Sequence, residues 1–172
     1  TDVARTGATL VPPYDDPRTM AGQGTIAVEI LEQLGREPDL VVVPVGGGGC
    51  ISGITTYLAE RTTSTSVLGV EPAGAASMIA ALAEGHPVDL PHVDQFVDGA
   101  AVKRAGALTF QALSSAGDMV SVVTVDEGAV CSAMLDLYQN EGIIAEPAGA
   151  LSVAGLLEAG VEPGSVVVCL IS

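Results

Sequence analysis

Four consecutive glycines at positions 46–49 are the clearest chemical signal in this chain. They follow the apolar run at residues 40–45, and a stretch typical of a helix, residues 50–61, comes directly after them. A glycine loop between a strand and a helix can turn several backbone N–H groups toward one point, at the positive end of the helix dipole. Glycine permits this because no side chain blocks close approach. The order of strand, glycine loop and helix therefore predicts a phosphate-binding site.

Spacing tests two common phosphate-binding motifs. A Walker loop requires G-x-x-x-x-G-K-[ST]; Gly48 and Gly53 have the glycine spacing, but Ile54 stands where the lysine is required. No three glycines in this segment have the G-x-G-x-x-G spacing of a dinucleotide fingerprint. Glu71, at the end of the next expected strand, could still serve as a ribose-binding acid, so a nicotinamide-dependent dehydrogenase stays open. A glycine turn that only packs a strand against a helix stays open as well.

The elements around the loop alternate between strand and helix, and Asp126 and Pro147 are typical of helix starts. This alternation predicts an α/β fold with a doubly wound, mostly parallel sheet. Its strands would end on one edge, in the loops at Gly46, Glu71 and Ser172, where ligands bind such sheets. The expected strands are residues 9–11, 40–45, 66–71, 120–125 and 165–171, and the expected helices are residues 24–34, 50–61, 75–83, 108–116, 127–140 and 148–159.

Composition narrows the class of protein. The chain has 172 residues, of which 48% are hydrophobic and 3% aromatic, so Val, Ile, Leu and Ala must build the core, as in a buried parallel sheet. A formal net charge of −15 argues against nucleic acid and an anionic membrane surface as partners. No apolar run is long enough to span a bilayer. The three cysteines, Cys50, Cys131 and Cys169, are widely spaced and indicate reduced thiols in a cytoplasmic protein.

Both ends of the sequence are typical of secondary-structure elements that are only partly included. Residues 1–7 resemble the end of a helix without its beginning, and the apolar run at residues 166–172 has no loop after it. A buried parallel strand rarely ends a chain, because ligands bind at its carboxyl end. We therefore expect the chain to be a piece of a larger protein.

The glycine loop and its surroundings resemble one enzyme family. Residues 44–53, P-V-G-G-G-G-C-I-S-G, are similar to the phosphate loop of fold type II pyridoxal-phosphate enzymes, the group of serine/threonine dehydratases and serine racemases. Further matches are A-G-Q-G-T, G-V-E-P and E-P-A-G-A, which occur here in the family's order. The segments at 85–91 and 98–104 resemble biosynthetic threonine dehydratases in particular. The resemblance covers most of the chain.

This resemblance implies a pyridoxal 5'-phosphate cofactor and a role for several residues. Ser172 matches the family serine whose hydroxyl contacts the pyridine nitrogen; otherwise it is an exposed strand-end hydroxyl. Glu146 resembles a glutamate near the cofactor ring, although a structural carboxylate at a helix start before Pro147 is equally compatible with the sequence. The cofactor phosphate would be held by the backbone amides of Gly46, Gly47, Gly48, Gly49 and Cys50.

The family's Schiff-base lysine lies in a segment like S-F-K-x-R-G-A, which is absent from this sequence. The one lysine, Lys103, matches a different family segment and reads as a surface or substrate-loop cation. No catalytic residue is therefore expected here, and the chain alone should be inactive. Glu71 and the carbonyl of Ala75 match part of a divalent-cation site of serine racemases, but Ser77 replaces its third ligand, an acid. We expect no tight metal site, and expect Glu71 to cap the following helix.

Taken together, the resemblance implies that residues 1–172 are the C-terminal portion of the large domain of a tryptophan synthase β-like enzyme. The intact protein would be a threonine dehydratase of isoleucine biosynthesis, which converts L-threonine to 2-oxobutanoate and ammonia. It would be a cytoplasmic homo-oligomer, a dimer or tetramer, that binds a small amino-acid substrate and neither nucleic acid nor a membrane. The sequence is also compatible with a serine dehydratase or racemase of the same fold, and with a non-catalytic anion-binding module.

Overall fold

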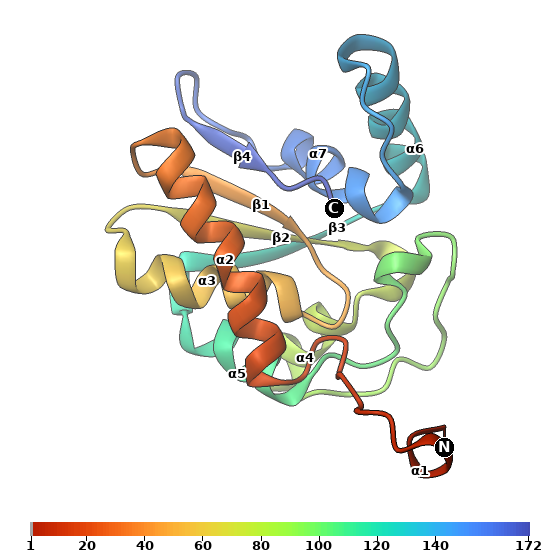
Figure 1. Cartoon of the computed structure of the whole chain (residues 1–172). Coiled ribbons are helices and arrows are strands. Elements are labelled where there is room, and N and C mark those ends of the chain that lie inside the picture. Colours follow the sequence, from red (N-terminus) through yellow and green to blue (C-terminus); the bar gives the residue numbers. More distant parts are fainter. Residues whose placement is uncertain (1) are drawn as a thin grey trace.

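Strands and helices alternate along the chain in the computed structural model, which describes residues 2–172 (Figure 1). Four parallel strands form one sheet in the order β3-β2-β1-β4. The strands are β1 (Leu40–Pro44), β2 (Ser66–Pro72), β3 (Val120–Val125) and β4 (Val167–Cys169). The helices are α1 (Asp2–Thr6), α2 (Pro17–Leu34), α3 (Gly49–Arg61), α4 (Ser77–Glu84), α5 (Ala107–Ser115), α6 (Glu127–Asp136) and α7 (Pro147–Glu158).

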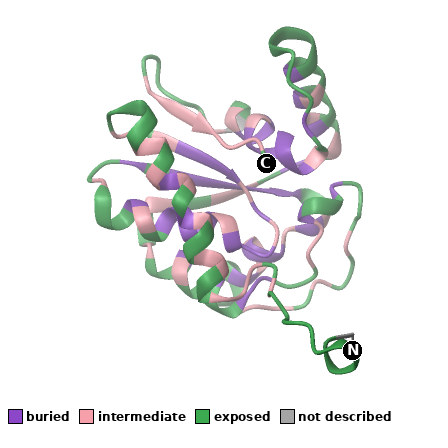
Figure 2. Ribbon diagram, viewed as in Figure 1, coloured by how far each residue is buried: buried purple, intermediate pink, exposed green. Residues whose placement is uncertain are grey.

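Valine builds the centre of the sheet. Val41, Val42 and Val43 of β1 are all fully buried, because helices cover both faces of the sheet (Figure 2). A strand buried on both faces needs apolar side chains at successive positions, not at alternate ones, and β-branched residues suit the extended backbone. The apolar run that predicted a strand in the sequence is therefore the central strand of a parallel sheet.

Each face of the sheet has its own hydrophobic core. One core joins the sheet to α2, α3, α4 and α5, and includes Ala27, Ile54 and Leu113. The other joins it to α6 and α7, and includes Val130 and Leu151. The result is a three-layered, doubly wound α/β fold, which confirms the predicted fold class.

The order of the strands creates a topological switch point beside β1. From β1 the chain proceeds outward to β2 and β3, and it then returns to the opposite side of β1 to form β4. In open parallel sheets, ligands bind in the crevice at the carboxyl ends of the strands where the direction of winding reverses. The glycine loop follows β1 and Ser172 follows β4, so both lie at this switch point.

Side-chain caps explain where two helices begin. Asp16 accepts a hydrogen bond from the Arg18 N–H at 2.8 Å at the start of α2, and Pro17 occupies the first helical position. Asp126 accepts one from the Ala129 N–H at 2.8 Å at the start of α6, as predicted. Because Asp16 and Pro17 supply these signals, α2 begins seven residues before the predicted residue 24.

Three sequence predictions need correction. Residues 9–11 form no strand; Leu10 and Val11 are 67% and 76% exposed, and two prolines without N–H donors follow them. The last strand is limited to β4, because it lies at the sheet edge and pairs with β1 at three positions only. The helix predicted to reach residue 140 stays α-helical to Asp136 and continues as a π-helical turn, Leu137–Glu141. No described helix is both long and apolar enough to cross a membrane.

Candidate functional site

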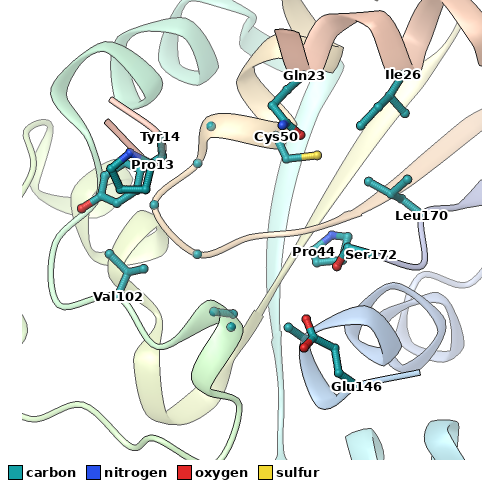
Figure 3. Close-up of a pocket in the computed structure, with 17 residues that line it drawn as sticks. Pro13, Tyr14, Gln23, Ile26, Pro44, Cys50, Val102, Glu146, Leu170 and Ser172 are labelled. Atoms are coloured by element: carbon teal, nitrogen blue, oxygen red, sulfur yellow. The ribbon is translucent and has the colours of Figure 1, made fainter. Parts of the chain in front are cut away.

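A cavity of about 520 Å³ opens at the carboxyl edge of the sheet, at the switch point (Figure 3). It brings together segments that are far apart in the sequence: the loop before α2, the glycine loop, the segment before α5, the start of α7 and the end of the chain. Every residue predicted to bind the cofactor lies in its lining. The lining residues are Pro13, Tyr14, Gln23, Ile26, Pro44, Gly46, Gly47, Gly48, Gly49, Cys50, Gly99, Ala100, Val102, Glu146, Ala148, Leu170 and Ser172.

The glycine loop presents a row of unused backbone donors. The N–H groups of residues 46–51 donate to no acceptor in the part of the chain that the structure describes, and the Ser52 N–H is the first to bond back, to the Gly48 carbonyl at 3.0 Å. Gly48 occupies the N-cap position of α3 and provides no side-chain cap. Unpaired amides at a helix N-terminus carry partial positive charge and bind anions. The geometry of the loop is therefore suited to a phosphate-sized anion.

Close packing leaves no room for side chains in this loop. A Cβ atom on Gly47 would overlap the aromatic ring of Tyr14. Gly48 has φ of +90°, a left-handed conformation, and a Cβ there would lie 2.8 Å from Oγ1 of Thr109. The backbone itself therefore forms the wall of the cavity, as a phosphate cradle built from amides requires.

Helix α5 holds the loop from outside the cavity. The Gly47 carbonyl accepts hydrogen bonds from the Thr109 hydroxyl at 2.7 Å and from the Gly106 N–H at 3.2 Å. Thr109 is fully buried, and its hydroxyl also contacts the Gly106 carbonyl at 3.2 Å. Thr109 is not predictable from the sequence, because no motif marks a threonine that bonds to a loop sixty-two positions away.

Ser172 and Glu146 form a polar wall on the side of the cavity opposite Pro13 and Tyr14 (Figure 3). Ser172 lies against the start of α7, where a Cβ on Gly149 would come within 2.5 Å of the Ser172 carbonyl oxygen. Glu146 occupies the N-cap position of α7, but its side chain makes no capping hydrogen bond. Its exposed carboxylate is therefore free of the helix backbone and lines the cavity. The negative charge is also close to the N-terminus of α7, as in the structural role that the sequence left open.

Positive potential in the cavity comes from backbone dipoles. Its lining, which consists of described residues only, contains no Lys, Arg or His. Burial raises the pKa of the Cys50 thiol to about 11, so this side chain is neutral near pH 7 and its amide is what faces an anion. A bound dianion would be stabilised by the amides and the dipole of α3, without a cationic side chain.

Comparison with known proteins agrees with this geometry. Residues 2–172 match the family model described as pyridoxal-phosphate dependent enzyme. The chain belongs to this family. The match covers the whole glycine loop, both walls of the cavity and all four strands, and it excludes the nicotinamide-dependent dehydrogenase that the sequence had left open.

Curated relatives of this pyridoxal-phosphate enzyme chain include the biosynthetic L-threonine dehydratase IlvA of Mycobacterium tuberculosis, 83% identical over 171 residues, and that of Corynebacterium glutamicum, 58% identical over 174. The matches cover 99% of this chain, which spans about 40% of the length of these relatives. Among solved structures, threonine deaminase isoform 2 from Solanum lycopersicum superposes with a TM-score of 0.91 at 37% identity, covering 99% of this chain and 50% of that one. Maize serine racemase has a TM-score of 0.85 at 32% identity, with coverage of 96% and 52%.

Lys103 lies outside the cavity of this pyridoxal-phosphate enzyme chain. Its ammonium group is 3.6 Å from a carboxylate oxygen of Asp89, and its side chain is 63% exposed. Arg104 donates to the other oxygen of Asp89 at 3.0 Å, and these two cations lower the pKa of that carboxyl group. The surroundings of Lys103 are those of the surface cation that the sequence indicated.

Glu71 is fully buried at the end of β2 and caps α4. Its two carboxylate oxygens accept hydrogen bonds from the N–H groups of Met78 at 2.7 Å and Ile79 at 2.9 Å. These bonds confirm the predicted cap. They also occupy both carboxylate oxygens, which would have to accept hydrogen bonds from a ribose in a nicotinamide-binding site. Nearby, the buried Ser77 hydroxyl finds no partner among the described residues. The same part of the chain holds no group of three His, Cys, Asp or Glu side chains that could bind a metal ion.

The cap at Glu71 leads to a testable pH dependence. Burial raises the pKa of Glu71 from 4.5 to about 7, against the opposing effect of its backbone hydrogen bonds. Because the folded pKa is the higher one, this group stabilises the fold fully below pH 4.5, and the contribution is lost as pH rises through about 7. In the full-length wild-type protein, this group should therefore lower the free energy of unfolding by about 3 kcal/mol as the pH rises from 4.5 to about 7. Glu71→Gln has no group to titrate here, so we expect this decrease to be absent from the variant.

Chemical denaturation at a series of pH values measures this effect. The matched control is Glu29→Gln, which makes the same chemical change at an exposed position of α2 and should leave the pH profile parallel to that of the wild type. Parallel profiles for wild type and Glu71→Gln would contradict the prediction.

Proposed function

We propose that this chain supplies the phosphate-binding and ring-binding part of a pyridoxal-phosphate-dependent threonine ammonia-lyase. Residues 1–172 would be the C-terminal portion of its large domain. The observation that carries the proposal is the row of unpaired amides at residues 46–51, at the N-terminus of α3 and at the switch point of the sheet. The 83% identity to the threonine dehydratase of M. tuberculosis supports threonine as the substrate, with 2-oxobutanoate and ammonia as products of isoleucine biosynthesis.

In the proposed enzyme, the glycine loop binds and orients the cofactor through its phosphate. The amides of residues 46–50 replace water as hydrogen-bond donors to the phosphate oxygens, and each such bond to a charged group is worth about 1.5–3 kcal/mol. The loop is fixed before binding by Thr109 and Gly106, so little ordering entropy is lost. The cradle thus sets the position of everything attached to the phosphate.

Bound pyridoxal phosphate supplies an electron sink for the pair of electrons left when the Cα–H bond of the amino acid breaks. Ser172 would place its hydroxyl beside the ring nitrogen. A hydroxyl, unlike a carboxylate, does not hold that nitrogen protonated, which suits loss of the β-hydroxyl from threonine better than full stabilisation of a carbanion. Glu146 would lie near the ring on the same wall of the cavity.

The catalytic lysine of the proposed enzyme comes from outside this chain, because Lys103 is an exposed, ion-paired side chain away from the cavity. The chain alone would then bind part of the cofactor and turn over no substrate. We expect the complete enzyme to be cytoplasmic, since the three cysteines are free thiols, and its resemblance to threonine dehydratases leads us to expect a homo-oligomer.

The test uses the full-length protein. Titration with pyridoxal phosphate should produce the visible absorbance of an enzyme-bound cofactor, and the loaded enzyme should form 2-oxobutanoate from L-threonine. A threonine enzyme gains contacts to the extra methyl group, so kcat/KM for threonine should exceed that for serine by about 10-fold or more. If the protein stays colourless with the cofactor, the proposal fails. If it is coloured but inert toward amino acids, the non-catalytic anion-binding module is supported instead.

A serine dehydratase or racemase is the second candidate, because maize serine racemase shares the fold at 32% identity. Kinetics with both substrates separate the two. Faster formation of pyruvate or D-serine from L-serine than of 2-oxobutanoate from threonine would support this candidate.

A further inference from the structure

The side chain of Tyr14 packs directly against the glycine loop (Figure 3). Its ring occupies the position where a Cβ on Gly47 would lie, and a Cβ on Gly49 would come within 2.9 Å of both Cα and Cβ of Tyr14. Two of the four glycines are therefore in contact with one tyrosine. Tyr14 belongs to the loop before α2.

Three hydrogen-bonded anchors hold Tyr14 in this place. Its hydroxyl donates to the Arg104 carbonyl at 3.3 Å. The carboxylate of the next residue, Asp15, accepts hydrogen bonds from the N–H groups of Ala107 at 3.0 Å and Leu108 at 2.8 Å, and so caps α5. The carbonyl of Tyr14 accepts a hydrogen bond from the Asp16 N–H at 3.0 Å. The tyrosine is thereby tied to the starts of both α2 and α5.

The same helix start also holds the glycine loop. Gly106 and Thr109, at the beginning of α5, donate to the Gly47 carbonyl. In a trans peptide the C=O and the following N–H point in opposite directions. Fixing the Gly47 carbonyl toward α5 therefore turns the Gly48 N–H away from α5, and that N–H has no acceptor within the described chain. The Tyr14 ring and α5 together leave the Gly47–Gly48 peptide little freedom to rotate.

We propose that Tyr14 is a positioning residue for the phosphate of the cofactor, acting through the peptide between Gly47 and Gly48; this inference rests on the proposed function. The ring does not donate to the phosphate. The ring restricts rotation of the Gly47–Gly48 peptide, whose N–H does donate, so that this N–H already points toward the phosphate position before the cofactor binds. Such preorganisation raises affinity by lowering the ordering cost of binding.

The expected consequence is a defect specific to the phosphate. In the full-length protein, Tyr14→Ala should raise the Kd for pyridoxal phosphate by about 10-fold, because one well-aimed bond to a charged acceptor is worth about 1.5–3 kcal/mol. The Kd for pyridoxal, which lacks the phosphate, should stay within about twofold of the wild-type value. Tyr14→Phe keeps the ring and should restore most of the affinity, while Tyr14→Leu, which keeps bulk without a flat ring, should fall between Phe and Ala.

Both Kd values are measured by absorbance titration of the same protein preparations, with thermal unfolding recorded alongside. Tyr57→Ala is the matched control: it removes the same atoms from α3, where Tyr57 packs against Arg61 outside the cavity lining, and should leave the ratio of the two Kd values unchanged. If Tyr14→Ala does not fold, Tyr14→Leu takes its place in the comparison.

Equal weakening of pyridoxal and pyridoxal phosphate by the Tyr14 variants would overturn the inference, because a general loss of structure affects both ligands. So would unchanged affinity of Tyr14→Ala or Tyr14→Leu for pyridoxal phosphate. Failure of the cofactor assignment gives a different result, since the wild-type protein itself would then bind neither compound. A wild-type protein that binds both compounds but does not act on amino acids would contradict the proposed reaction and leave the comparison of the Tyr14 variants valid.

Discussion

Replacing Gly48 with alanine in the full-length protein is expected to weaken binding of pyridoxal phosphate by about 100-fold or more, which corresponds to roughly 3 kcal/mol. Two effects combine at this position. The residue has φ of +90°, which an L side chain rarely adopts. The added Cβ would also lie 2.5 Å from the Met78 methyl group and 2.8 Å from the Thr109 hydroxyl oxygen. Relieving either contact would shift the backbone at Gly48, and with it the N–H group that we expect to bind the cofactor phosphate.

A control separates the cradle from backbone strain. Gly35 ends α2 with φ of +63°, and a Cβ there would meet no atom within 4 Å. Gly35→Ala should therefore lose stability from its dihedral angles, with no loss of affinity once folded. Absorbance titration of both variants with pyridoxal phosphate measures the difference. Unchanged affinity in a folded Gly48→Ala protein would contradict the role assigned to the loop.

The centre of the fold and the cradle were predictable because their signals are local. The valines of β1, the four glycines and the start of α3 are consecutive in sequence, and the predicted strand and helix boundaries there are correct to one residue. Parallel strands also end on a common edge, so the loops after β1 and β4 were expected to meet. Ser172 accordingly lines the same cavity as Gly46.

The supports of the cradle were not predictable in this way. The bond from Thr109 to Gly47 and the ring of Tyr14 against the loop join segments far apart in the chain. No sequence motif marks either residue, because a threonine or a tyrosine at these positions is compatible with many different tertiary contacts. Likewise, the apolar residues Leu10 and Val11 suggested a strand from propensity alone, but they are largely exposed and pair with none of the four strands of the sheet.

The crossing of α2 and α3 supports a second prediction, on stability. The two helices approach so closely that a Cβ on Gly53 would overlap the Met20 carbonyl oxygen and lie 2.8 Å from the Gly24 nitrogen. These are backbone atoms within a helix, which cannot move aside as the end of a flexible side chain can. Gly53→Ala in the full-length protein should therefore lower the free energy of unfolding by about 3 kcal/mol or more, because the helices must separate.

Gly22→Ala on α2 is the matched control, since a Cβ there meets no atom within 4 Å. Alanine is the better helix former, so this variant should gain up to about 1 kcal/mol. Denaturant unfolding of the two variants should thus shift in opposite directions from the wild type. The α2–α3 contact also carries Gln23 and Cys50 into the cavity lining, so a folded Gly53→Ala protein should bind pyridoxal phosphate more weakly. Equal stability of the two variants would show that α2 and α3 can separate at no cost, and that Gly53 does not determine how closely they approach.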